Sequence, residues 1–197
     1  MFYKLKPKEN LDLRNKLFLE KGIVALKKQG FEKSPFNTDW YGRTNHNDFS
    51  YTMYRLKKEN ELQKIETHIL RNENWIQIRL NIFKIRPEIN SLEELKESDG
   101  LKFHLPPNSL TEMRLRSDTY DCMPLFYMLF LPEHKIGRYF TKNGFNKRLK
   151  ELSELVLKDM RNIDFYIAKW KEKYKPKTVN WKSDTNEKIK NTAHNTV

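Results

Sequence analysis

The chain has 197 residues, among them 38 Lys and Arg against 26 Asp and Glu, which gives a formal net charge of +12. Its single cysteine, Cys122, excludes an intrachain disulfide, and its longest apolar run, 125–131, is far shorter than the ~20 residues that span a bilayer. We therefore expect a cytoplasmic protein without a secretory signal or a membrane segment.

The positive charge is weak evidence for a polyanionic partner. Lysine far outnumbers arginine and asparagine is abundant, which is typical of AT-rich codon usage and raises the charge whatever the partner is. The distribution of the charge is more informative, because residues 138–182 hold 13 Lys and Arg against 5 Asp and Glu. Any function of the charge is therefore expected in this segment.

The first predicted element is a helix over residues 11–29. Apolar residues recur at helical spacing through this range, from Leu13 and Leu17 onward. Gly30 follows in the place where a left-handed residue ends many helices. Residues 31–48 contain Pro, Gly and several Asn, so we expect a loop there, held to the body of the protein by aromatic side chains.

Three β-strands are predicted next, at 49–57, 62–70 and 75–85. Short polar turns separate them, so we expect an antiparallel meander. The third strand alternates, with Ile78 and Leu80 on one face and Gln77 and Arg79 on the other. One face should pack on the core, whereas the other is amphipathic.

Shorter elements are predicted between the meander and residue 132. Ser91 and Glu94 have the spacing of a capping box, which indicates a short helix to about residue 97. Alternating apolar residues indicate short strands at 101–105 and 113–116. Residues 125–131 are apolar at every position between two prolines, which favours a central strand covered on both faces, with a buried helix as the alternative.

The strongest periodic pattern predicts a helix of about 30 residues over 145–174, where large apolar residues recur at steps of three or four. Pro176 ends it. We therefore predict an α+β fold, with an N-terminal helix, an antiparallel meander extended by further strands, and a long amphipathic C-terminal helix on one sheet face. Residues 1–176 are expected to form one domain, and 177–197 a polar, flexible tail with Trp181 as its anchor.

Basic and aromatic residues alternate from 169 to 177, a mixture that suits a phosphate backbone and stacked bases. The predicted nucleic-acid-binding residues are Arg114, Arg116, Lys169, Trp170, Lys171 and Lys173. The competing interpretation is structural, because cations stabilise the last turns of a helix and Trp170 belongs to the apolar stripe. We consider the structural interpretation the stronger one.

A second candidate surface is the amphipathic face of the third strand, where Trp75, Arg79 and Phe83 could bind a ligand. No RNP-like signature accompanies these residues. The competing interpretation is that a helix or loop covers the aromatic side chains, since large exposed apolar patches are uncommon on monomers.

No motif in the sequence names a reaction. The glycines are scattered without a phosphate-binding pattern, and G-x-S-x-G, H-E-x-x-H and C-x-x-C are absent. His46 and Asp48 could form a two-histidine, one-carboxylate iron site with a distant histidine, His104 or His134. Turn chemistry explains the loop around them better. Cys122 could be a nucleophile, but a small buried apolar role is expected. No catalytic residue, metal or cofactor is therefore predicted.

The sequence favours a non-catalytic binding module for a protein or a small ligand, because the chain is rich in aromatic residues and lacks catalytic motifs. One alternative is a nucleic-acid-binding protein that uses the basic C-terminal helix. The other is an enzyme of unrecognised type, which would need a pocket where His46, Asp48, His104, Cys122 or His134 converge. The predicted fold class decides between none of these.

Overall fold

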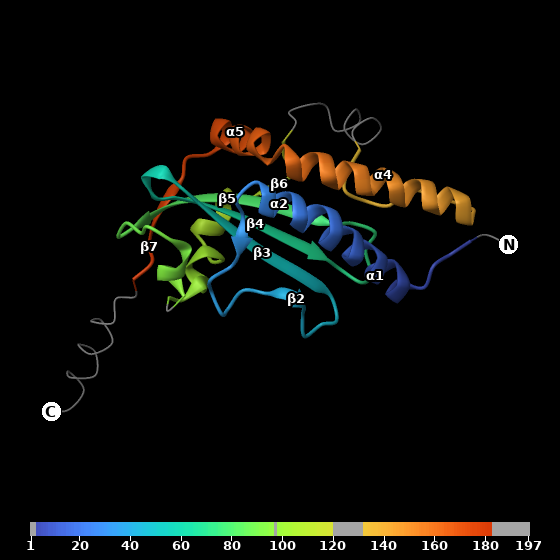
Figure 1. The fold of residues 1–197 in the computed structure, drawn as a ribbon, viewed down its shortest axis with the longest axis horizontal. Helices are drawn as coiled ribbons and strands as arrows, with labels where there is room; N and C mark the ends of the chain where they lie inside the picture. Colours follow the sequence, from blue (N-terminus) through green and yellow to red (C-terminus); the bar gives the residue numbers. More distant parts are fainter. Residues whose placement is uncertain (1–2, 97, 120–131, 183–197) are drawn as a thin grey trace.

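The computed structural model describes residues 3–96, 98–119 and 132–182. Over these ranges the chain forms a seven-stranded sheet with its long helices on one face (Figure 1). The predicted α+β class, with an N-terminal helix and C-terminal helices packed on an antiparallel sheet, is confirmed. Cys122 and the strand predicted at 125–131 lie outside the described residues.

The centre of the sheet is an antiparallel meander of three long strands, β3 (Phe49–Lys57), β4 (Glu61–Ile69) and β5 (Gln77–Arg86). The predicted meander is thus confirmed. Short strands complete the two edges: β1 (Glu32–Lys33) and β2 (Tyr41–Arg43) pair with β3, and β6 (Met113–Arg114) and β7 (Lys177–Asn180) pair with β5. The β5–β7 pairing is parallel, and the other pairings are antiparallel.

Two stretches expected to be irregular therefore contribute to the sheet edges. The loop predicted at 31–48 includes β1 and β2, and the segment assigned to a tail begins with β7. Val179 of β7 is buried, and the indole N–H of Trp181 donates to the carbonyl of Pro87 at 2.7 Å. Residues 183–197 lie outside the described part of the chain.

The N-terminal helix is longer than predicted and contains a π-helical turn. It consists of α1 (Pro7–Leu17), the π-turn η1 (Phe18–Ile23) and α2 (Val24–Lys28). Pro7 occupies the first helical turn, where its missing N–H costs nothing. Gly30 follows with φ +82°, so the predicted left-handed residue after the helix is confirmed.

The C-terminal helix predicted as one element is two, α4 (Lys142–Arg161) and α5 (Ile163–Lys173). Asn162 separates them with φ −102° and ψ 30°, and its side-chain amide donates to the carbonyl of Lys158 at 3.0 Å. The apolar stripe continues across the break, with Met160 and Ile163 both buried, so the periodicity gave no sign of it. No helix in the described ranges is long and apolar enough to cross a membrane.

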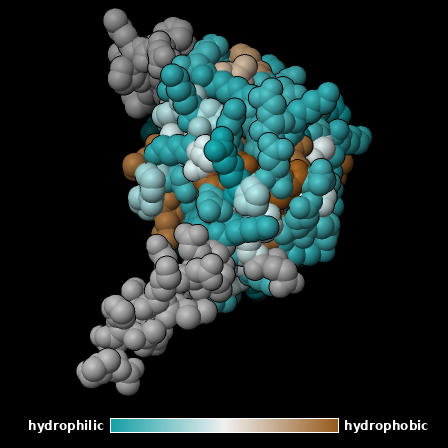
Figure 2. Space-filling view, turned by 90° about the vertical axis from the view of Figure 1, so that its left-hand side faces the viewer, coloured by the Kyte–Doolittle hydropathy of each residue, from teal (hydrophilic) through white to brown (hydrophobic). Residues whose placement is uncertain are grey.

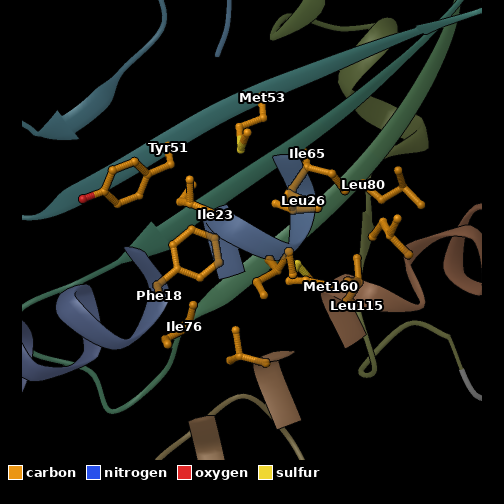
Figure 3. Close-up of a cluster of buried hydrophobic side chains, with 14 of the residues drawn as sticks. Phe18, Ile23, Leu26, Tyr51, Met53, Ile65, Ile76, Leu80, Leu115 and Met160 are labelled. Atoms are coloured by element: carbon orange, nitrogen blue, oxygen red, sulfur yellow. The ribbon is translucent and has the colours of Figure 1, made fainter. Parts of the chain in front are cut away.

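The main hydrophobic core lies between the helices and the sheet (Figure 3). Phe18, Ile23 and Leu26 of the N-terminal helix face Met53 of β3 and Ile65 of β4. Met160 of α4 and Leu80 of β5 belong to the same cluster, which explains why alternate residues of each central strand are apolar.

A smaller core covers one end of the opposite sheet face. Three 3₁₀ turns pass over this face: η3 (Leu92–Leu95), η4 (Gly100–Phe103) and η5 (Asn108–Thr111). The capping box of Ser91 and Glu94 is confirmed, whereas the strand predicted at 101–105 is wrong. Phe103 lies in the 3₁₀ turn η4 instead of a strand, and its ring packs on Phe83 with 5.2 Å between ring centroids.

A buried ion cluster joins α4 to the segments that follow β5. The guanidinium of Arg116 binds both carboxylate oxygens of Asp159, and His134 Nε2 lies 2.9 Å from the same carboxylate. The Asp159 side chain is 4 % exposed. Burial alone would raise the pKa of Asp159, but His134 and Arg116 lower it from 3.8 to about 2.

Asp159→Asn should lower the free energy of unfolding by about 3–5 kcal/mol, because the substitution removes the buried carboxylate charge that Arg116 and His134 both contact. Urea denaturation at pH 7 measures this loss. The matched control is Glu154→Gln on α4, whose pair with Lys150 is exposed and should contribute less than about 1 kcal/mol. Equal losses in the two variants would contradict the structural role of the Asp159 cluster.

Candidate functional site

A cleft of about 370 Å³ opens on the sheet face opposite the long helices. Its floor consists of side chains from β3 and β4, and its walls come from the segments before and after β2 and from residues 101 and 104. The smaller core, with Tyr54, Leu62 and Phe83, occupies the other end of the same face. The cleft therefore lies where this sheet face changes from apolar to polar residues.

The register of β3 and β4 determines which side chains reach the cleft. The two strands are joined through η2 (Lys58–Asn60), and Ser50 pairs with His68 while Thr52 pairs with Glu66. Because side chains alternate along a strand, Glu66 and His68 lie on the cleft side, whereas Ile65 lies in the main core. The alternate polar residues of these two strands thus come together in the floor of the cleft.

Ser50, His68 and Glu66 form a linked set in this floor. Ser50 Oγ lies 3.2 Å from His68 Nδ1, and His68 Nε2 lies 3.0 Å from Glu66 Oε1. The side chain of His68 is 25 % exposed, and all three residues line the cleft. An imidazole held between a hydroxyl and a carboxylate can accept the proton of that hydroxyl and later return it.

A second imidazole faces the same cleft and is also fixed by a carboxylate. His104 Nε2 lies 2.6 Å from Asp39 Oδ1, and the hydroxyl of Ser34 donates to the other oxygen of Asp39 at 2.5 Å. Lys64 Nζ lies 2.8 Å from His104 Nδ1 and 2.6 Å from Glu66 Oε2. Lys64 therefore connects the two histidine–carboxylate pairs.

The charges at the cleft differ from those of the whole chain. Three carboxylates line it, those of Asp39, Asp48 and Glu66, whereas none of the described lysines or arginines does. Burial would raise the pKa of Glu66, but hydrogen bonds and charge from His68 and Lys64 hold that pKa well below its usual value of 4.5. Glu66 is therefore a fixed negative charge at neutral pH.

The rim of the cleft is apolar. Trp40 is 43 % exposed and Leu101 is 47 % exposed, and both line the opening. Phe49 and Leu70 add further apolar surface. An apolar rim over a few convergent polar groups is the usual composition of a small-molecule site.

The structure does not bring the predicted ligand-binding residues of the third strand together on an open surface. Phe83 is fully buried beneath Phe103, and Arg79 binds Glu112 at 3.0 Å. Trp75 lies just before β5, where Lys135 Nζ stands 4.6 Å from the centre of its ring. None of the three lines the cleft.

The predicted nucleic-acid-binding residues are largely engaged with the protein. Trp170 is fully buried, and its indole N–H donates to the carbonyl of Thr111 at 2.6 Å. The three lysines each contact a neighbour, in the pairs Lys169–Glu172, Lys171–Glu61 and Lys173–Asp118 carbonyl. Arg116 belongs to the buried cluster with Asp159, and only Arg114 of the two arginines is exposed.

Three of the residues considered for catalysis, His46, Asp48 and His104, line the same cleft, whereas His134 lies in the Asp159 cluster. Within the described ranges, no group of three or more His, Cys, Asp or Glu side chains is placed to hold a metal ion. Sequence reasoning missed Ser50 and Glu66. The hairpin about residues 58–60 was a usable signal, because it sets Ser50 opposite His68.

Comparisons with protein-family models, with curated proteins and with solved structures find no match for this chain.

The free energy of unfolding should depend on pH through Glu66. Because its pKa is lower in the folded chain than in the unfolded one, the unfolded state binds more protons below about pH 4.5, and stability falls as the pH drops. Glu66→Gln should lower the free energy of unfolding at pH 7. Between about pH 5 and pH 3, the free energy of unfolding of this variant should fall less than that of the wild type. Urea titrations across this range measure how the free energy of unfolding changes with pH in each protein. An equal change in the variant and the wild type would contradict the role of Glu66 in this pH dependence.

Proposed function

We propose that the protein is a binding module that holds one small ligand in the cleft. The observation that supports this most is the cleft itself, in which two oriented imidazoles and a hydroxyl meet beneath an exposed tryptophan. Its volume of about 370 Å³ suits a molecule of modest size or a single protruding side chain. The polar floor would orient the ligand, and Trp40 and Leu101 would cover its apolar part.

The expected ligand is neutral or cationic. The carboxylates of Asp39, Asp48 and Glu66 line the cleft and none of the described lysines or arginines does, so a polyanion would meet repulsion there despite the net charge of the chain. Trp40 at the rim offers an aromatic face, which suits an apolar group or an organic cation.

On the side of the molecule that Figure 2 shows, the distribution of apolar groups favours a small ligand over a large protein surface. Figure 2 shows one side of the molecule, on which the surface is mainly hydrophilic and the hydrophobic patches are small and separate. Docking sites for proteins are commonly marked by larger continuous apolar patches. We place this activity in the cytoplasm, in line with the expectation from the single cysteine.

Nucleic-acid binding has less support. Trp170, the aromatic residue among the predicted binding residues, is buried, and the lysines around it already bind protein groups. A groove for a single strand needs aromatic faces that are open to the bases. We therefore do not propose it as the function.

Leu101→Arg should abolish ligand binding in the cleft. Leu101 is half exposed at the rim, so a longer, charged side chain can fill the opening at little cost in stability. The measurement is a screen of small neutral and cationic fragments by NMR, with shift changes expected at Trp40, His68 and His104 in the wild type and none in Leu101→Arg.

Leu110→Arg is the matched control for this screen. Leu110 is 69 % exposed in η5, which passes over the same sheet face as η4. It lies outside the cleft, so this variant should bind fragments like the wild type. Fragments that bind Leu101→Arg as well as the wild type, or that shift only residues outside the cleft, would overturn the proposed function.

A further inference from the structure

Ser50, His68 and Glu66 have the mutual geometry of an activated nucleophile. The hydroxyl and the base are 3.2 Å apart, and the base and its carboxylate are 3.0 Å apart. These separations match the hydrogen-bond reach at which a neighbouring base activates serine. We propose that Ser50 is a nucleophile for acyl transfer, that His68 is its general base, and that Glu66 is a positioning residue for His68.

The protonation pattern required for this role follows from the contacts. Glu66 accepts a hydrogen bond only if His68 carries a proton on Nε2, which leaves Nδ1 free to accept from the hydroxyl of Ser50. Lys64 Nζ lies 2.6 Å from Oε2, the other carboxylate oxygen of Glu66, and so stabilises the charged form of this carboxylate. The side chain of His68 is thereby oriented toward Ser50.

The expected reaction is hydrolysis of a small carboxylic ester in two steps. Ser50 Oγ forms a bond to the carbonyl carbon while its proton moves to His68 Nδ1, and the alcohol leaves with that proton as its C–O bond breaks. Water then attacks the carbonyl carbon of the acyl-serine and gives one proton to His68. His68 passes this proton to Ser50 Oγ as the bond between Oγ and the acyl carbon breaks and the carboxylic acid leaves. No oxidant, metal or further reactant is consumed.

The cleft determines the substrate class. Its volume of about 370 Å³ admits a short acyl chain and a small alcohol, and Trp40 and Leu101 would contact the apolar part. Thr52 and Asn45 line the same cleft and can donate hydrogen bonds to the carbonyl oxygen. The lining carboxylates disfavour an acidic ester.

This inference rests on the proposed function, because the ester occupies the cleft described above, and it replaces a purely non-catalytic module with one that also acts on its ligand. It also explains why no sequence motif indicated the site. The nucleophile lies within a strand rather than in the turn of a G-x-S-x-G motif.

The test is covalent labelling of the full chain with a small alkyl fluorophosphonate. Attack by Ser50 Oγ forms an O–P bond, releases fluoride and gives the serine proton to His68. Peptide mass spectrometry should locate the label on Ser50, and this result needs no variant. Ser50→Ala should abolish labelling, whereas Ser153→Ala on α4, away from the cleft, should leave it unchanged.

Two further variants separate chemistry from structure. His68→Gln should lower the labelling rate by roughly 100-fold or more, the usual contribution of a general base. Glu66→Gln should lower it less and shift the pH at which the rate rises, an effect that a merely structural role would not produce. Each variant is first compared with the wild type by circular dichroism.

Absence of label on the wild-type protein, or a label on another residue, would overturn the inference. So would a rate and pH profile that Glu66→Gln leaves unchanged in a folded protein. The fragment screen distinguishes this failure from failure of the proposed function, because fragments would still bind the cleft if only the nucleophile were misassigned.

Discussion

The register between β3 and β4 determines which side chains reach the main core and which reach the cleft. Pairing about η2 sets Tyr51, Met53 and Ile65 toward the helices, and Ser50, Glu66 and His68 toward the cleft. A shift of β4 by one residue would turn Ile65 toward the cleft and Glu66 and His68 toward the main core, because side chains alternate along a strand. The burial of the apolar set in the main core therefore also fixes the arrangement of the polar one.

The polar end of the sheet face is stable because its groups satisfy one another. Glu66, 14 % exposed, binds both His68 and Lys64, and Lys64 in turn contacts His104. Partly buried charges without such partners would be strongly destabilising. The network thus keeps ionisable groups stable beside the cleft, which the turns η3, η4 and η5 leave open. A binding or reactive site needs such groups next to an open space.

Local patterns predicted the elements that depend on local chemistry. The alternation of the three central strands, Gly30 after the first helix and the capping box at Ser91 all appeared as expected. The failures concern tertiary contacts. Residues 101–105 alternate like a strand, yet Phe103 packs into the smaller core and η4 forms instead. Pairing of β7 with β5 joins residues about 90 positions apart, which no local pattern reveals.

The candidate site was only partly predictable for the same reason. His46, Asp48 and His104 were recognisable by residue type, but their convergence depends on how the loop and η4 fold over the sheet. Ser50 and Glu66 had no motif, and their importance emerges only from the cross-strand register. The predicted use of Trp75, Arg79 and Phe83 assumed an open face, which the covering turns close over Phe83.

The protonation state of His68 shows whether this side chain can act as the base for Ser50, because it reports the contacts with Ser50 and Glu66 together. Long-range ¹⁵N–¹H correlation spectra at about pH 8 distinguish the two ring nitrogens of a neutral imidazole. We expect a single form of His68, with its proton on Nε2 and none on Nδ1. A proton on Nδ1, or a signal that averages both tautomers, would contradict it.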